Sequence, residues 1–141
     1  MKELALKQID TFTTAPFRGN PAGIVLGADE LDGGAMQRIA AEMATAETAF
    51  VQSTGSMTIP WRARFFTPNC EYDFSGHSVI AVAYALVEEG LVELADGVTS
   101  LLVETKSGPV PIDIHFRSIA SGVSPGALPV EVGGHTVGFL E

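Results

Sequence analysis

Four consecutive residues with chemically useful groups stand where a long apolar segment begins. They are Ser75, Gly76, His77 and Ser78, and the apolar segment predicts a helix over residues 76–91. The serine can cap backbone amides, the N–H groups of the first turn attract anions, and the imidazole can carry a proton. An ordinary helix cap with a histidine beside it is the favoured interpretation of these four residues taken alone.

Glu47 is the second candidate because it opens an apolar segment, residues 47–52, that predicts a strand. A carboxyl group partly buried by such neighbours is suited to giving and taking protons near neutral pH. The alternative is an exposed carboxylate at the end of a strand, and without further context that interpretation is favoured.

Cys70 is the one cysteine and offers a thiol mechanism, although a lone cysteine is more often an inert small apolar residue. The histidines His77, His115 and His135 are far apart, and none has a partner ligand three or four residues away. The glycines form no nucleotide-binding pattern after a strand. We therefore expect neither a metal nor a cofactor.

The segments that must position these residues alternate between strand and helix patterns. Residues 34–44 place apolar side chains three and four positions apart, which predicts a helix with one buried face. The predicted strands cover residues 4–12, 22–26, 47–52, 59–66, 101–106, 110–116 and 130–140. The last of them contains a turn at Gly133 and Gly134.

The fold class follows from the helix predicted over residues 76–91. It is apolar almost all the way round, so other elements must enclose it. With at least seven short strands available, a curled sheet is the simplest enclosure. We predict an α+β fold, in which a strongly curved mixed β-sheet wraps around one buried central helix and a second helix lies on the surface.

Composition narrows the class of protein further. The chain has 141 residues, which fits a single domain over 1–141. Its 8 Lys and Arg against 17 Asp and Glu give a net charge of −9, so we expect no nucleic-acid and no membrane partner. A lone Cys70 cannot form an internal disulfide, and the first ten residues lack the apolar core of a signal peptide. We therefore expect a cytoplasmic protein.

Five blocks of sequence occur in an order and spacing that resemble the phenazine-biosynthesis isomerase (PhzF-like) family. The blocks are residues 10–12, 16–23, 46–51, 64–68 and 71–77. The resemblance implies the diaminopimelate epimerase-like fold, in which two similar lobes each fold a curved sheet around a central helix. This agrees with the architecture predicted from the apolar helix.

The resemblance also implies roles for individual residues. Glu47 is expected to be the general acid/base that moves a proton between substrate carbons, and His77 is expected to line the same cleft as its catalytic partner. No metal, flavin or nicotinamide is implied. The expected substrate-binding residues are Asn20, Asp73, Ser75, Gly76 and Ser78.

One departure from the family concerns its second lobe, which carries a G-x-x-E-D-P-x-T-G-S type motif that this sequence lacks. We predict that residues 1–117 form the core of the first lobe, that 118–128 replace the second lobe as a linker, and that 129–141 close the sheet. Because one lobe supplies only one wall of a cleft, we expect two copies to form a homodimer around the substrate.

The function predicted on these grounds is that of a cofactor-independent isomerase or epimerase. It would move a proton between carbons of a small carboxylated metabolite, in an active site completed at the homodimer interface. The alternative is a catalytically silent lobe that binds small acids or serves as an assembly module. A thiol-dependent enzyme acting through Cys70 is a third, weaker interpretation.

Overall fold

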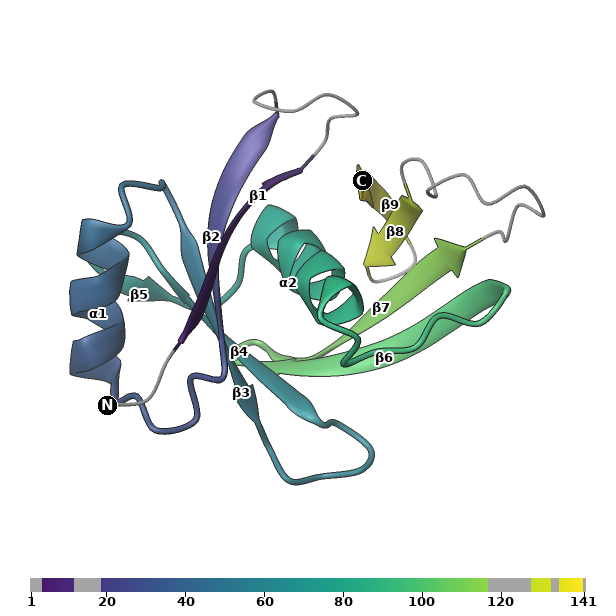
Figure 1. Cartoon of the computed structure of the whole chain (residues 1–141), viewed down its shortest axis with the longest axis horizontal. Helices are drawn as coiled ribbons and strands as arrows, with labels where there is room; N and C mark the ends of the chain where they lie inside the picture. Colours follow the sequence, from purple (N-terminus) through teal and green to yellow (C-terminus); the bar gives the residue numbers. More distant parts are fainter. Residues whose placement is uncertain (1–3, 12–18, 117–127, 133–134, 141) are drawn as a thin grey trace.

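A sheet that bends around one helix dominates the chain, and a second helix lies outside the curve (Figure 1). The computed structural model describes residues 4–11, 19–116, 128–132 and 135–140. The helices are α1 (Gly33–Glu42) and α2 (Gly76–Glu88). The strands are β1 (Ala5–Thr11), β2 (Asn20–Leu26), β3 (Thr48–Ser53), β4 (Trp61–Phe66), β5 (Glu71–Tyr72), β6 (Gly97–Thr105), β7 (Gly108–Phe116), β8 (Leu128–Val132) and β9 (His135–Leu140).

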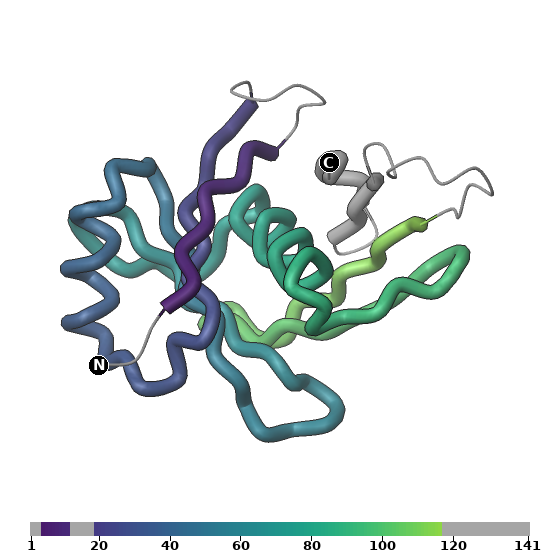
Figure 2. Tube along the Cα trace, in the orientation of Figure 1, coloured from purple at the N-terminus to yellow at the C-terminus, as the bar shows by residue number. Residues whose placement is uncertain are grey.

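The order of the strands explains why the sheet has a helix on each side. The order is β1-β2-β3-β4-β6-β7-β8-β9, with β5 added to β4 outside this path. Only the pairs β2–β3 and β4–β6 are parallel among the described strands. Parallel neighbours need a crossover connection, and α1 and α2 lie in these two crossovers. Figure 2 shows α2 inside the curve of the trace and α1 outside it.

The central helix α2 is enclosed as its composition predicts. Eight of its residues are buried, and seven of them, from Val79 to Leu86, are apolar. They pack against inward-facing residues of the sheet such as Ile24, Val51 and Ile112. Burial of apolar surface on all sides of one helix is the main stabilising contribution to this core. The predicted α+β class, with a strongly curled mixed sheet around α2, is confirmed.

The carboxyl end of α2 comes earlier than the sequence pattern predicts. The helix ends at Glu88 rather than at residue 91. Gly90 adopts a left-handed backbone with φ of 72°, and the N–H of Leu91 donates to the carbonyl of Leu86. This is the usual arrangement in which a glycine reverses the chain and satisfies the last helical carbonyls.

The second predicted helix, α1, covers the outer face of the sheet. Asp32 caps its first turn through a 2.7 Å hydrogen bond from the Ala35 N–H. Met36 and Ala40 are buried against a second apolar cluster that includes Phe50. Strand β3 is therefore covered on both faces, which explains why its first four residues are all buried.

Most predicted strands shift by one or two residues at an end, and the larger differences concern β5 and β6. Strand β5 was not predicted, because two residues are too few to give an alternating pattern. Strand β6 begins at Gly97 instead of residue 101. Its first residues are mostly exposed and so give no apolar signal in the sequence, but their pairing with β7 makes them part of the strand. Strands β8 and β9 continue the sheet beyond β7. The predicted linker at 118–128, apart from Leu128, and the predicted turn at 133–134 lie outside the described residues.

No helix among the described residues is both long enough and apolar enough to cross a bilayer.

Enclosure of α2 gives a direct stability prediction. Leu86 is fully buried and Leu91 is 49% exposed, so the pair forms a matched test. Leu86→Ala leaves a cavity in the core and should lower the free energy of unfolding by about 2–5 kcal/mol, whereas Leu91→Ala should change it by no more than about 0.5 kcal/mol. Urea unfolding followed by circular dichroism measures both; equal losses in the two variants would contradict the enclosed helix.

Candidate active site

Glu47 lies just before β3, and its backbone is held tightly in place. Its carbonyl accepts hydrogen bonds from the Gly23 N–H at 2.9 Å and from Thr45 Oγ1 at 3.0 Å. A Cβ added at Gly23 would lie 2.6 Å from Met43 Cε and 3.1 and 3.2 Å from Thr45 Oγ1 and Thr48 Oγ1, so glycine leaves room for these side chains. Ala44 has φ of 54°, an uncommon backbone for a residue with a side chain. The turn that carries Glu47 is therefore strongly constrained.

The side chain of Glu47 meets the first turn of α2. Ser75, the N-cap residue of α2, donates from Oγ to Glu47 Oε2 at 2.6 Å, and Ser78 Oγ donates to the same oxygen at 2.9 Å. Both serines are buried, while the Glu47 side chain is 24% exposed. The positive end of the helix dipole and the two hydroxyls stabilise a carboxylate at this place.

His77 completes the cluster through its ring. The Nδ1 atom lies 2.8 Å from Glu47 Oε2 and 3.3 Å from Ser75 Oγ. The opposite ring atom, Nε2, is buried and makes no hydrogen bond with a described residue. The ring is thus anchored by Glu47 on one side and has an unused polar atom on the other.

Ser75 and Ser78, which are expected to bind the substrate, both contact Glu47 in the structure. Ser78 is fully buried and its hydroxyl is occupied by Glu47, so it positions the carboxylate. Ser75 accepts from the Ser78 N–H at 3.4 Å while it donates to Glu47. Gly76 differs, because a Cβ built on it would meet nothing within 4 Å. Open space at Gly76 leaves room for a ligand against the helix amides.

Tyr72 is the residue of this cluster that sequence analysis missed. Its hydroxyl is buried and has no hydrogen-bond partner of ordinary geometry among the described residues. Burial raises the pKa of the Tyr72 phenol far above its usual value, and the negative charge of Glu47 adds to the rise. The phenol therefore stays protonated beside the carboxylate. The only sequence signal was its place, three residues before Ser75, within the last of the five blocks that carry the resemblance.

The other expected site residues are not joined to this cluster by any contact among the described residues. Asn20 is exposed at the start of β2, where it pairs with Thr11. Asp73 is exposed between β5 and α2. The thiol of Cys70 is also exposed and lies 3.5 Å from Thr67 Oγ1. Among the described residues, no group of three or more His, Cys, Asp and Glu side chains is placed to hold a metal ion.

A strongly curled mixed sheet around an apolar helix is the architecture of one lobe of the diaminopimelate epimerase-like fold. A PhzF-family protein of Bacillus anthracis superposes with a TM-score of 0.76 and 40% identity, over 94% of this chain and 40% of that one. A predicted epimerase of Pseudomonas aeruginosa shares the fold with a TM-score of 0.73 over 91% of this chain and 42% of that one, at 24% identity.

The chain belongs to the PhzC-PhzF family of phenazine biosynthesis-like proteins, whose family model matches residues 9–125. An uncharacterized isomerase of Bacillus subtilis is 36% identical over 114 residues, which cover 81% of this chain and 37% of that protein. The chain thus spans about two fifths of the length of the relatives it matches.

The raised pKa of Tyr72 predicts its behaviour at alkaline pH. Since the folded-state pKa lies above the unfolded value of 10.0, the buried phenol contributes stability below pH 10 that is lost as pH rises through the folded value. The chain has two tyrosines, so the variant Tyr84→Phe isolates Tyr72. Its near-ultraviolet tyrosinate absorbance should rise only together with unfolding measured by circular dichroism. Ionisation near pH 10 in a folded protein would show that the phenol is not buried.

Proposed function

We propose that this lobe belongs to an isomerase or epimerase that moves a proton between carbons of a small carboxylated metabolite. Glu47 is the general acid/base, His77 is its catalytic partner, and the reaction needs no cofactor. Membership of a family that includes an uncharacterized isomerase supports the class of reaction. The observation that carries the assignment is the convergence of Glu47 and His77 at the first turn of α2.

The arrangement of donors supports the acid/base role. Both serines and His77 contact Oε2, whereas Oε1 makes no hydrogen bond with a described residue. In the proposed reaction Oε1 takes a proton from one substrate carbon and returns it to another. The electron pair left behind shifts through the conjugated part of the substrate, so the substrate is neither oxidised nor reduced. His77 acts through its Nδ1 contact with Oε2, which stabilises the carboxylate while Oε1 carries the proton.

The substrate carboxylate is assigned to the amides at the start of α2. The N–H groups of Gly76 and His77 make no hydrogen bond with a described residue, and the side of Gly76 is open. A helix amino end with unpaired N–H groups attracts anions. Asn20 and Asp73 are proposed to bind other polar groups of the same substrate.

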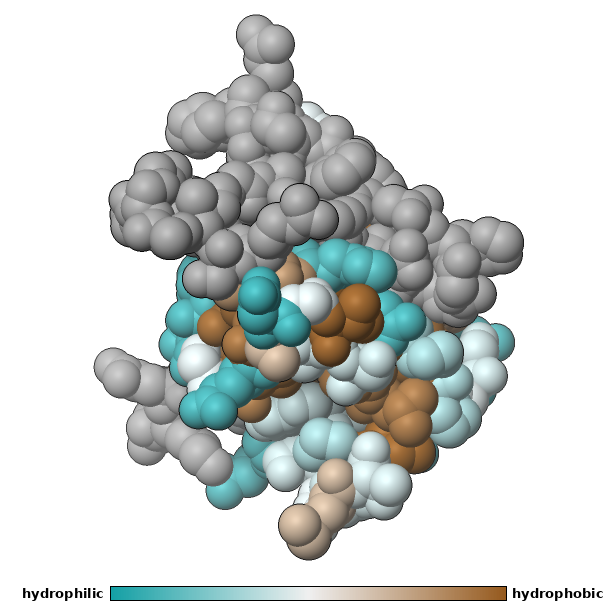
Figure 3. Space-filling view, turned by 90° about the vertical axis from the view of Figure 1, so that its right-hand side faces the viewer, coloured by the Kyte–Doolittle hydropathy of each residue, from teal (hydrophilic) through white to brown (hydrophobic). Residues whose placement is uncertain are grey.

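Completion of the cleft by a second copy is part of the proposal. The chain covers about two fifths of the length of its relatives. A single lobe provides only one wall of the proposed cleft. Leu91 and Val98 are about half exposed, and Figure 3 shows apolar surface among hydrophilic residues on the side where α2 leads into β6. The shared cleft itself requires contact at the amino end of α2, because Glu47 lies there, whereas Leu91 and Val98 follow the carboxyl end of the helix. The cytoplasmic setting stays a prediction from the single cysteine.

Exchange of hydrogen with solvent tests the acid/base role. The chain is incubated in deuterium oxide with a panel of small amino, hydroxy and unsaturated carboxylic acids, and deuterium at carbon is measured by mass spectrometry. Glu47→Gln should reduce exchange by at least about 100-fold, because it removes the group that carries the proton. The amide oxygen of glutamine still accepts from Ser75 and Ser78, so folding should be kept.

Glu42→Gln is the matched control, since Glu42 is an exposed carboxylate at the end of α1. This variant should exchange as fast as the unaltered chain. Exchange that persists in Glu47→Gln would remove Glu47 from the mechanism. Absence of exchange in the unaltered chain with every acid, together with saturable binding of one of them, would favour the silent binding lobe.

The homodimer is tested by mass in solution at several protein concentrations. We expect a two-chain mass at micromolar concentration, and exchange activity per chain that falls as dilution splits the pair. Light scattering with size-exclusion chromatography gives the mass, and the exchange assay is run on the same dilutions. Full activity in a strictly single-chain species would eliminate the shared cleft.

A further inference from the structure

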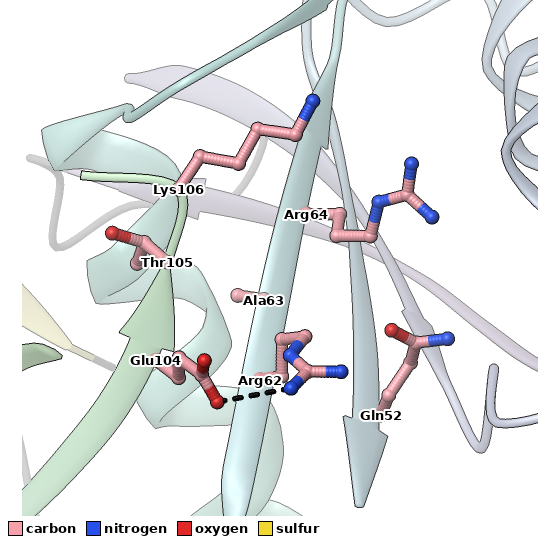
Figure 4. A pocket seen from close by; sticks show the side chains of 7 residues that line it. All are labelled: Gln52, Arg62, Ala63, Arg64, Glu104, Thr105 and Lys106. Atoms are coloured by element: carbon pink, nitrogen blue, oxygen red, sulfur yellow. Dashed lines mark hydrogen bonds and ion pairs between the residues drawn. The ribbon is translucent and has the colours of Figure 1, made fainter. Parts of the chain in front are cut away.

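A second hollow lies away from Glu47, on the outer face of the sheet (Figure 4). Its volume is about 410 Å³, within the range typical of small-molecule sites. The polar side chains around it are Gln52 on β3, Arg62 and Arg64 on β4, and Glu104 and Lys106 at the end of β6. None of these residues takes part in the cluster around Glu47.

The hollow exists because β4 and β6 separate. Their parallel pairing is limited to Trp61 with Val103 and Arg62 with Glu104. Beyond these pairs β4 runs toward β5, while β6 turns back into β7. Alternation along β4 places Ala63 in the core around α2 and Arg64 on the opposite face.

The charge in the hollow is opposite to that of the chain. Arg62, Arg64 and Lys106 are three of the 8 Lys and Arg, in a chain with a net charge of −9. Their carboxylate partners are Glu104 and Glu71, so three cations minus two anions leave one positive charge. A local positive hollow on an acidic protein selects and concentrates small anions.

The side chains of Arg62, Arg64 and Lys106 are held by carboxylates, and each still has N–H groups that can donate to a ligand. Arg64 binds Glu71 through Nε at 2.8 Å and Nη2 at 2.9 Å, and Lys106 Nζ lies 3.0 Å from the same carboxylate. Arg62 uses Nη2 for Glu104 at 3.1 Å. The Nη1 groups of both arginines and two ammonium protons of Lys106 remain. The side chains of Arg62 and Lys106 are about half exposed, so a ligand can reach them.

The carboxylate of Glu71 keeps the arrangement charged. The Arg64 guanidinium and the Lys106 ammonium hold the pKa of Glu71 below its usual range, and Glu71 in turn raises the pKa of Arg64. Glu71 thus holds Arg64 and Lys106 in place before any ligand binds. Binding of an anion therefore costs less side-chain conformational entropy. Figure 4 shows the side chains of Arg62 and Arg64 extending from β4 on the side where Gln52 lies.

We propose that this hollow binds a small organic anion through a carboxylate or phosphate group. The two arginines and Lys106 donate to the anionic oxygens, and the Gln52 side chain lies at the edge of the site. The site is independent of Glu47, because it lies on the opposite face of the sheet, so both can be occupied at once.

The test is a titration of the full chain by nuclear magnetic resonance at constant ionic strength. One arm uses inorganic phosphate and the other uses succinate, each replacing sodium chloride up to about 20 mM. We expect saturable shifts of the Arg62 and Arg64 side-chain N–H signals, and the tighter arm identifies the preferred group. Lys106→Gln and Arg62→Gln should each weaken binding about tenfold, as loss of one charge-assisted contact implies.

Lys7→Gln is the matched control, because it removes one positive charge that pairs with Glu88 and Glu89 elsewhere in the fold. It should leave the affinity of the hollow unchanged. Equal weakening in Lys7→Gln would mean that overall charge alone attracts the anion and would overturn the proposal. So would the absence of saturable shifts at Arg62 and Arg64 with both anions, since the backbone spectrum of each variant reports its folding separately.

Discussion

The contact between the Glu47 carboxylate and the amino end of α2 is the constraint around which the candidate active site is arranged. A negative charge is stabilised there by the helix dipole, by two serine hydroxyls and by His77. Both partners are placed by the core, since β3 pairs with β2 and β4 while α2 is enclosed by the sheet. The packing that buries the helix therefore also brings the acid to its first turn.

The two-residue strand β5 connects this site with the outer face of the sheet. Glu71 holds Arg64 and Lys106 on one side, and Tyr72 places its hydroxyl beside Glu47 on the other. Successive residues of a strand point to opposite faces, so such a short element can serve two surfaces. Because β4 is the one strand that pairs with β5 among the described strands, the position of both groups depends on it.

The residues of the candidate site were predictable to different degrees. Glu47 and His77 came from the resemblance, because neither a single glutamate nor a helix-start histidine is specific on its own. The hydrogen bond from Ser78 to Glu47 was not predictable, since the direction of the hydroxyl is set only when the first turn of α2 forms beside β3. Tyr72 was missed because its burial beside Glu47 results from the pairing of β5 with β4.

The sequence by itself determined the family, the α+β class and the enclosed helix, because an apolar surface on all sides of a helix allows no other environment in water. It also determined that the chain is acidic. Only the tertiary structure decided which polar groups meet. The Glu47 cluster spans residues 47 to 78, and the outer hollow joins β3, β4 and β6. Such contacts depend on which strands pair and where they separate, and that is decided by packing of the whole chain rather than by the pattern within one strand.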